Sequence, residues 1–528
     1  MIKIKNPYSS KRLSYKDKFN KKFTDLLVPY IKKIHLEEDW SFKSKYIPQV
    51  LKNARISIEG WDRNFWTNEK PNNIELDLLS LYVAEYIPTE NLDNLNKGLK
   101  KLINKFPSKH EYGQFEQFER IDNFCSEVKQ SIHSGRWSNF GFIDIGKEPR
   151  LSKFVENIYV EASHVTSSSV ILQFLIKPSD EFLNEYKCIV EKNVKGSSVF
   201  TPSLKKFFKF WGAKGLAEPI IKNQMLEDLI IELKWITMNE ISKFFDLYFT
   251  NNRIIPPSIE VYKLKQLSCE IKEEKKGLKN DFWRSVGMDN FYDVSKDGYW
   301  QLFSEETSPH FLDCSLKVTC NTEIQKQSMY PTYDFQIVYS LQEFTKRLLP
   351  ILAIREYAFD VSKKVAIQQN KTFLSIKKEN PKYKSLINVR HELERDLQIL
   401  KRFKNEIGDN YFDNVKSTLK KISEFEPSRP QYREKAVTDM IVDNTSYLVE
   451  KTFNHSQYFA KMIDEATKLL EIKTNNSLRA STFFLTITTV IFSIIATAIA
   501  AASFYFQLNE NTKDELQNLI SNINSFFS

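Results

Sequence analysis

The sequence predicts an α+β cytoplasmic region followed by long antiparallel helices, a stalk helix and one C-terminal transmembrane helix. Three observations support this order. Strand-like and helix-like runs both occur before residue 330, whereas the later residues have mainly helical spacing. No glycine or proline occurs from Gln431 onward, so a helix can continue there without a break. Within that stretch, residues 480–509 include no side chain that is charged at neutral pH.

Length and composition are those of a folded chain. The 528 residues are 41% hydrophobic and 13% aromatic, which is enough for a packed core in two or three domains. The 76 basic and 67 acidic residues give a net charge of +9, an excess too small to indicate duplex nucleic-acid binding. The five cysteines form no CxxC pair, so we expect free thiols in a reducing compartment.

Residues 1–330 are predicted to form one or two mixed α+β cytoplasmic domains, with a division near residue 200 left open. The chain starts MIKIKNPYSSKRLSYKDKF, which is basic and has no apolar signal-peptide core, so we expect this part to stay in the cytoplasm. Residues 158–179 read as two strands joined by a Ser-rich turn, and residues 314–320 as another short strand. An amphipathic helix is predicted from Leu226 to Phe245.

Residues 331–430 are predicted to form an antiparallel helical region. Long helices are expected at Leu341–Ile376 and Leu386–Phe403, separated by Pro381, and a third at Asn410–Phe425. The EPSRP segment at 426–430 separates the third helix from the next element.

Residues 431–479 are predicted to form a stalk helix that begins near Glu434 and continues into the membrane. Its apolar or small residues recur at steps that are sums of three and four. These residues are Val437, Ile441, Leu448, Phe459, Met462, Ala466 and Leu469.

Residues 480–507 are predicted to cross one bilayer as a single helix. The segment exceeds the ~20 residues that are needed to cross a hydrocarbon core of ~30 Å. Phe483 and Phe484 lie near one end and residues 504–506, Phe-Tyr-Phe, near the other, as is typical of membrane interfaces. A buried core helix is the alternative, but soluble helices are rarely apolar on all sides over this length.

The charges around this span predict its orientation. Basic residues are concentrated on the N-terminal side, which indicates that this side faces the cytoplasm. They are Lys461, Lys468, Lys473 and Arg479, whereas Lys513 follows the span among acidic residues. High Lys, Asn and Ile content with 13 Gly is associated with an AT-rich bacterial genome, so we expect a bacterial inner membrane. Residues 508–528 are expected to form a short amphipathic tail outside.

One stripe of the span contains small and hydroxylated residues at alternating steps of four and three. It consists of Thr482, Thr486, Thr489, Ser493, Ala496, Ala500 and Ser503. In lipid such a stripe is typical of a helix-packing seam, because small residues allow close approach and hydroxyls bond across the interface. Alternatively, several copies form a ring in which the stripe lines a narrow uncharged pore. Both interpretations require more than one copy of the chain.

A candidate site for an anionic ligand, such as a nucleotide, lies in the soluble part at Leu204–Gly215. Cations next to aromatic rings can hold such a ligand by charge and stacking. The residues are Lys205, Lys206, Lys209, Trp211 and Lys214. The alternative is an ordinary helix whose buried face contains the aromatic residues of the same segment.

No catalytic, metal or cofactor site is predicted. Asp228, Glu232 and Lys234 have the letters of a nuclease D…ExK set, but they occur in a helical pattern rather than on strands. The seven histidines form no HxH, HExxH or HxxxH pair, and no GxxxxGK[ST], GxGxxG or GxSxG motif occurs.

The arrangement of a mixed cytoplasmic domain, antiparallel helices and a basic-ended stalk entering a C-terminal span resembles the CorA-type divalent-cation channel superfamily. The resemblance is architectural and covers Leu341 to Asn509. That family has a Gly-Met-Asn signature and a second membrane helix. This chain instead reads YFQLN at 505–509, and no second membrane helix is predicted. The resemblance therefore implies an ion channel but transfers no selectivity residue.

Members and look-alikes of this superfamily with an enlarged N-terminal region also occur as membrane effectors of bacterial antiviral systems. By this resemblance, the first 330 residues are expected to sense a nucleotide signal. We therefore expect a homo-oligomer whose cytoplasmic sensor controls a membrane helix assembly. The alternative is an anchored scaffold or docking protein in which the span only localises a binding domain.

Overall fold

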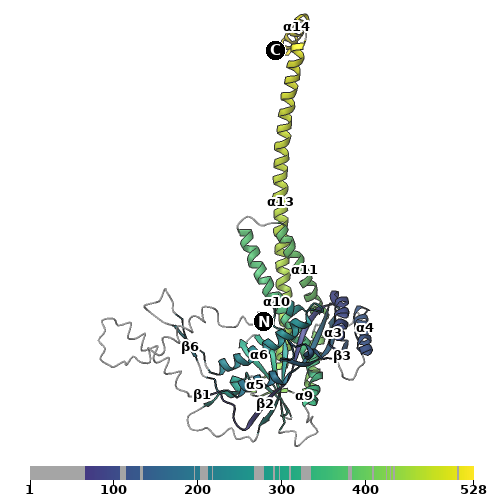
Figure 1. Cartoon of the computed structure of the whole chain (residues 1–528). Coiled ribbons are helices and arrows are strands. Elements are labelled where there is room, and N and C mark those ends of the chain that lie inside the picture. The colour runs from purple at the N-terminus through teal and green to yellow at the C-terminus, as the bar shows by residue number, and fades with distance from the viewer. Residues whose placement is uncertain are drawn as a thin grey trace, which may run out of the picture. The chain divides into compact units, whose positions relative to one another are not determined.

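The computed structural model describes most of the chain from residue 66 onward (Figure 1). The described residues are 66–107, 114–130, 135–194, 197–201, 212–216, 218–266, 279–288, 292–296, 298–308, 311–322, 334–377, 383–406, 409–423, 425–428, 430–431, 434–507 and 510–527. The chain divides into two compact units, one formed by 1–364 with 396–455 and the other by 365–395 with 456–528.

A nine-stranded sheet is the centre of the first unit. Its order is β13 (Phe425–Pro427), β10 (Tyr292–Ser295), β11 (Trp300–Ser308), β12 (Phe311–Asn321), β8 (Ser258–Gln266), β2 (Ile74–Pro88), β5 (Ser169–Pro178), β4 (Val155–Thr166) and β3 (Trp137–Ile143). Neighbouring strands are antiparallel except β12 and β8, which are parallel. Two smaller strand pairs join β1 (Trp66–Thr67) to β9 (Lys279–Asn280) and β6 (Ser197–Thr201) to β7 (Gly212–Leu216).

The sheet combines strands from both sides of residue 200. β2 to β5 precede that residue and β8 to β13 follow it, so the division near residue 200 that the sequence left open does not separate two sheets. The predicted hairpin at 158–179 is confirmed as β4 and β5, which pair up to Thr166 and Ser169. The predicted strand at 314–320 is confirmed as part of β12.

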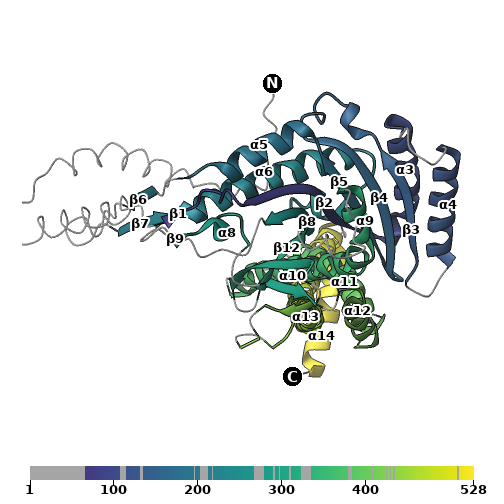
Figure 2. The same ribbon diagram turned by 90° about the horizontal axis from the view of Figure 1, so that it is seen from below.

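Helices cover one face of the sheet and enclose the main apolar core. They are α3 (Leu92–Lys105), α4 (Gln114–Gln130), α5 (Asp180–Glu191) and α6 (Glu218–Ile241). Figure 2 shows α5 and α6 over this face. Alternate strand residues such as Val160, Leu172 and Phe174 are fully buried in this core. This is expected because successive side chains of a strand point to opposite faces of the sheet. Gly98 of α3 allows close packing, because a Cβ there would lie 2.5 Å from the carbonyl oxygen of Phe244.

The opposite face is covered by helices from later in the chain (Figure 2). These are α9 (Asp334–Ser340), α10 (Gln342–Lys377), α11 (Tyr383–Glu406), α12 (Asp409–Ser423) and α13 (Val437–Gln507), with α10, α11 and α13 contributing only their first-unit parts. The Tyr82 hydroxyl donates a hydrogen bond to the Val338 carbonyl at 3.0 Å. The Tyr86 ring centroid lies 4.7 Å from that of Tyr357. Short elements η2 (Thr89–Asn91), η3 (Ile145–Lys147), α7 (Tyr248–Asn251) and α8 (Phe282–Ser285) complete this unit.

The predicted helices agree with the structure to within a few residues at most ends. The expected helices at 341–376, 386–403 and 410–425 correspond to α10, α11 and α12, and the stalk and span together correspond to α13. The division into two compact units does not test the expected boundaries at 330, 430 and 479, because α10, α11 and α13 each contribute residues to both units.

The second unit consists of the end of α10, the start of α11, the rest of α13 and α14 (Glu510–Phe527). Gln368 Nε2 donates to a Glu392 carboxyl oxygen at 3.2 Å, and Arg390 Nε to an Asp464 carboxyl oxygen at 3.0 Å. Hence, within this unit, the end of α10 lies beside the start of α11, and the start of α11 lies beside α13. Among the described residues, α13 is the one helix whose length and composition would allow it to cross a membrane.

Candidate functional site

The membrane-like segment of α13 has no partner within the described chain. All its side chains from Leu478 to Ser503 are exposed, although most are apolar. At 100° per residue, the predicted stripe from Thr482 to Ser503 occupies an arc of about 100° on one side of the helix. The structure thus presents the stripe as one continuous exposed surface, available either to lipid or to another copy of the chain.

The threonine hydroxyl groups of this segment are already used as donors within the helix. Those of Thr482, Thr486 and Thr489 each donate to the carbonyl oxygen four residues earlier at 2.8 Å. Each hydroxyl oxygen therefore still offers its lone pairs as acceptors. A hydroxyl that donates to its own backbone costs little in lipid, and its free lone pairs can accept from a neighbouring helix or contact a cation.

A shallow groove of about 510 Å³ runs along the middle of the segment beside the stripe. Thr489 and Ser493 belong both to the stripe and to the groove. The groove lining consists of Thr489, Val490, Ser493, Ile494, Thr497, Ala498 and Ala501. Small side chains create this hollow, which is the shape that allows two helices to approach closely.

Upstream of the apolar segment, α13 exposes large apolar side chains at intervals of eleven residues. Tyr447, Tyr458 and Leu469 are 62%, 64% and 68% exposed. An eleven-residue interval returns to nearly the same side of a helix, so these side chains lie on one line. By contrast, Val437, Ile441 and Phe459 of the predicted seam are fully buried within the chain. Leu469 also belongs to the predicted seam, so the seam is buried near its start and exposed at its end. Tyr447, Tyr458 and Leu469 are thus available for contact with other copies.

A buried polar cluster lies between the sheet and the first turn of α10. Gln342 of α10 donates to one carboxyl oxygen of Glu161, which is 2% exposed in the middle of β4. The other carboxyl oxygen of Glu161 and the Oε1 atom of Gln173, its direct neighbour on β5, accept no hydrogen bond. One turn further along α10, Lys346 Nζ lies 3.8 Å from the centroid of the Trp137 ring.

The electrostatics of this cluster make Glu161 a titratable group near neutrality. Burial raises the pKa of Glu161 to about 7, although the polar side chains of Gln342 and Trp137 and the charge of Lys346 favour its ionised form; the charge of Glu343 disfavours it. Lys346 Nζ also pairs with a carboxyl oxygen of Glu343 at 3.2 Å, so this cation is shared between the acidic side chain of its own helix and the Trp137 ring.

A second buried carboxyl group, Glu85 of β2, holds the chain turn at α7. It accepts hydrogen bonds from the Phe249 and Thr250 amides at 2.9 and 3.0 Å and from the Thr250 hydroxyl at 2.5 Å. Burial raises the pKa of Glu85 to about 8 despite these donors. Since its donors belong to one turn, we assign Glu85 a structural role.

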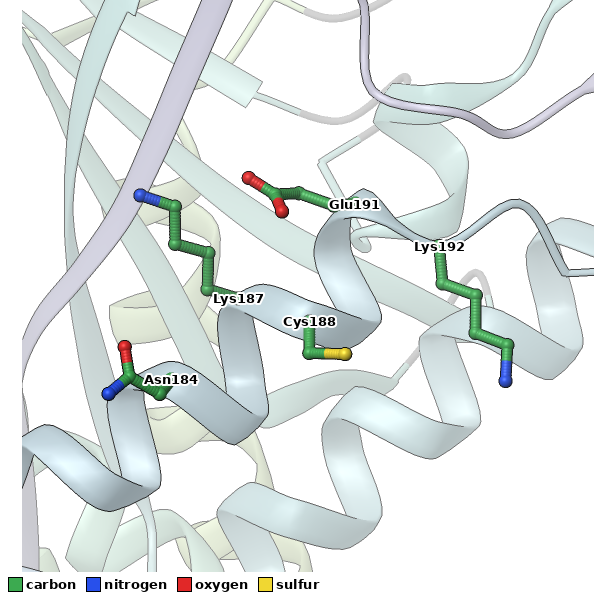
Figure 3. A pocket seen from close by; sticks show the side chains of 5 residues that line it. All are labelled: Asn184, Lys187, Cys188, Glu191 and Lys192. Atoms are coloured by element: carbon green, nitrogen blue, oxygen red, sulfur yellow. The ribbon is translucent and has the colours of Figure 1, made fainter.

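A surface hollow of about 610 Å³ lies on α5, lined by Asn184, Lys187, Cys188, Glu191 and Lys192. Figure 3 shows Lys187 and Glu191 on one side of the helix and Cys188 and Lys192 on the other. Lys187 pairs with Asp77 at 3.7 Å and Glu191 with Lys70 at 3.2 Å. Because one helix and the residue after it supply every lining side chain, the hollow does not enclose a ligand.

The predicted anionic-ligand site falls mostly outside the described residues. Lys205, Lys206, Lys209 and Trp211 lie there, and Lys214 is on β7, where it pairs with Val199 of β6. Asp228, Glu232 and Lys234, the residues of the D…ExK pattern, lie on helix α6, as the sequence indicated. Lys234 Nζ donates a hydrogen bond to the Ser315 hydroxyl at 3.1 Å. Within the described residues no three His, Cys, Asp or Glu side chains are grouped to hold a metal ion.

The sequence interpretation missed the Glu161 cluster, although a signal was present. Glu161 lies between Val160 and Ala162 in a predicted strand, and a carboxyl group between apolar neighbours there indicates a buried partner. Comparison with known proteins adds no assignment: no family model, curated protein or solved structure matches this chain.

Proposed function

We propose that the chain is an oligomeric, single-pass protein of a bacterial inner membrane, with its α/β unit in the cytoplasm. In this proposal the α/β unit controls an assembly of the C-terminal membrane helices, and that assembly conducts ions. Partners are the lipid bilayer, other copies of the chain and a nucleotide or other anionic ligand on the cytoplasmic side. The CorA-like architecture and the role as an antiviral membrane effector belong to the same proposal.

The observation that carries the proposal is the continuity of α13. Its first residues, up to His455, belong to the α/β unit, and the same helix continues through the exposed apolar segment to Gln507. At its start, the Val437 amide donates to an Asp293 carboxyl oxygen of β10 at 2.5 Å. This helix contains no glycine or proline, and in this proposal it carries a displacement of the sheet to the membrane segment.

Self-association is supported by the exposed surfaces of α13. A helix that only anchors a protein needs apolar side chains, but not a stripe of small hydroxylated residues on one side. The line formed by Tyr447, Tyr458 and Leu469 offers a further contact before the membrane. Conduction is supported by the hydroxyl oxygens, whose free lone pairs can replace part of an ion's hydration shell.

The test is the oligomeric state of the detergent-solubilised full chain beside a chain that ends at Asn475, measured by mass photometry. We expect a defined ring for the full chain and smaller species for the shortened one. A monomer or dimer in both cases would contradict the assembly and leave the anchored scaffold.

Ion flux into liposomes then separates the pore from a non-conducting bundle. The full chain is compared with one in which residues 480–507 are replaced by an unrelated hydrophobic helix of equal length. We expect flux only with the native segment. A replacement that conducts as well, or a native ring that never conducts with any nucleotide tested, would overturn the pore.

A further inference from the structure

Helix α14 has one apolar face and one polar face. Its described apolar side chains, Leu516, Leu519 and Ile520, fall within an arc of about 100° around the helix. Leu519 is 61% exposed and Ile520 is 49% exposed, so the described chain leaves this face largely open. The opposite side is exposed and polar, and it consists of Asp514, Gln517, Asn518, Ser521, Asn522 and Ser525.

The short connection to α13 limits where α14 can lie. Helix α13 ends at Gln507 and α14 begins at Glu510, so two residues join them (Figure 1). Even when fully extended, this connection spans about 11 Å. The headgroup layer extends roughly 5–8 Å beyond the hydrocarbon core on each side. If α13 crosses the bilayer as far as Gln507, α14 therefore begins within the headgroup layer or just outside it.

The positions of the apolar residues select the orientation of α14. Leu519 is nine residues after Glu510, so in a helix perpendicular to the membrane it would lie about 14 Å farther from the core, in water. A helix that folded back into the core would place Asp514 and Asn518 in hydrocarbon, where polar groups are costly. In a helix parallel to the surface, the apolar face meets the acyl chains and the polar face meets water.

The charge of this segment indicates which part of a lipid it binds. Residues 508–528 contain one basic residue, Lys513, and three acidic residues, Glu510, Asp514 and Glu515. Basic interfacial helices gain affinity from anionic headgroups, but a segment with a net negative charge does not. The apolar face is therefore the part that binds, and its partner is the acyl-chain region.

We propose that α14 is an interfacial helix that lies in the membrane surface on the side opposite the α/β unit, with Leu516, Leu519 and Ile520 among the acyl chains. The inference rests on the proposed span of α13, and it goes beyond that proposal by assigning a role to the C-terminal residues. In this position α14 holds the far end of α13 at the bilayer surface and resists movement of that helix along its axis toward the α/β unit.

The experiment uses the full chain in phosphatidylcholine vesicles with plain or brominated acyl chains, because bromine quenches the fluorescence of tryptophans within the core. All eight native tryptophans precede residue 301 and give a common baseline. Leu519→Trp with Ile520→Trp adds two on the apolar face. Bromination should then remove up to about a fifth of the total emission beyond the loss in the parent, since two of ten tryptophans lie in lipid.

The matched control is Asn518→Trp with Ser521→Trp, on the polar face of the same turns. It should show less than about a third of that additional quenching. Equal quenching of both pairs would show that neither face is turned toward lipid, and no additional quenching in the first pair would place α14 away from the bilayer. Either result overturns the inference. The difference should persist in vesicles that contain phosphatidylglycerol; its appearance only with that lipid would contradict binding through acyl chains.

Mass photometry in detergent tests the other occupant of this face, which is a second copy of the chain. Leu519→Ser with Ile520→Ser should leave the oligomer unchanged, as should the control Asn518→Ala with Ser521→Ala. Weakening of the oligomer by the first pair alone would make α14 a contact between copies and would overturn the lipid assignment.

Flotation of the parent chain with phosphatidylcholine vesicles separates the sources of failure. A chain that does not float contradicts the span and, with it, the interfacial helix. A chain that floats as a monomer and shows the expected quenching in the first pair contradicts the proposed assembly alone. A chain that floats without that quenching contradicts the position of α14 alone.

Discussion

The two ends of α13 place similar side chains in opposite surroundings. Near its start, Ile441 and Val442 are fully buried against the chain's own sheet and helices. Beyond Leu478, equally apolar residues such as Phe484 and Phe492 are exposed. Burial of an isoleucine or phenylalanine side chain contributes about 1.5–3 kcal/mol. The fold thus stabilises the first part of the helix, whereas the second part needs lipid or other copies to remove it from water.

The largest effect is expected from a substitution in the buried first part of α13. Ile441→Ala should reduce the free energy of unfolding of the α/β unit by about 2–5 kcal/mol, because Ile441 is 0% exposed. Ile494→Ala, at a residue that is 63% exposed, should leave it unchanged. Urea unfolding in detergent followed by tryptophan fluorescence measures this, since all eight tryptophans precede residue 301. Equal effects of the two substitutions would contradict the contrast.

The second effect concerns the buried carboxyl group under α10. The folded pKa of Glu161, about 7, lies above the ordinary value of 4.5, so between these values the native state binds more protons than the unfolded state. Stability therefore falls as pH rises through this window. Glu161→Gln should remove this dependence and stabilise the protein at pH 8 by up to about 3 kcal/mol, with little change at pH 4.

The measurement is urea unfolding of both proteins between pH 4 and pH 8. Glu85 contributes a similar slope in both proteins, so the difference between them isolates Glu161. A variant that is less stable than the parent at pH 8 would show that ionised Glu161 is held by Lys346, and the sign of the prediction would be wrong.

The third effect concerns the exposed stripe. Thr489→Leu with Ser493→Leu should weaken oligomer formation about 5- to 30-fold, because interhelical contacts of this kind contribute about 1–2 kcal/mol. Thr488→Leu with Ala502→Leu makes similar additions outside both the stripe and the groove of the same helix and should have little effect. Mass photometry across a dilution series measures both. If the two pairs behave alike, the stripe is only a lipid-facing surface.

The smallest expected effect concerns the exposed line before the membrane. Tyr447→Ser with Tyr458→Ser should weaken the oligomer about two- to fivefold and leave urea unfolding unchanged, because both rings are mostly exposed in one copy. Phe335→Ser with Tyr339→Ser on α9 removes comparably exposed rings and serves as the control. A loss of stability with no change in the oligomer would place the tyrosines in the fold instead.

Helix positions could be predicted because their signals are local. Pro427 and Pro430 mark the gap before α13, and the spacing of Leu386, Leu393 and Leu400 indicates the buried face of α11. All three leucines are indeed buried. The neutral segment after Arg479 is likewise evident from charge alone, as is the Thr482 to Ser503 stripe.

The sheet order and the buried cluster depend on contacts between distant residues. β8 lies beside β2, although about 170 residues separate them, and no local pattern specifies that pairing. Gln342 and Glu161 meet for the same reason. The sequence contained the unusual carboxyl group of Glu161, but only the fold identifies the helix that covers it.

Helices α10, α11 and α13 are shared between the two units, and their first parts complete the packing of the sheet. Ile259, Val261 and Val318 are fully buried but lie outside the core beneath α3 to α6, so they depend on the later helices for cover. A chain cut at residue 330 would present these side chains to water and should aggregate. The strands before residue 330 therefore do not make a self-sufficient domain, because one whole face of their sheet is completed by helices that come later in the chain.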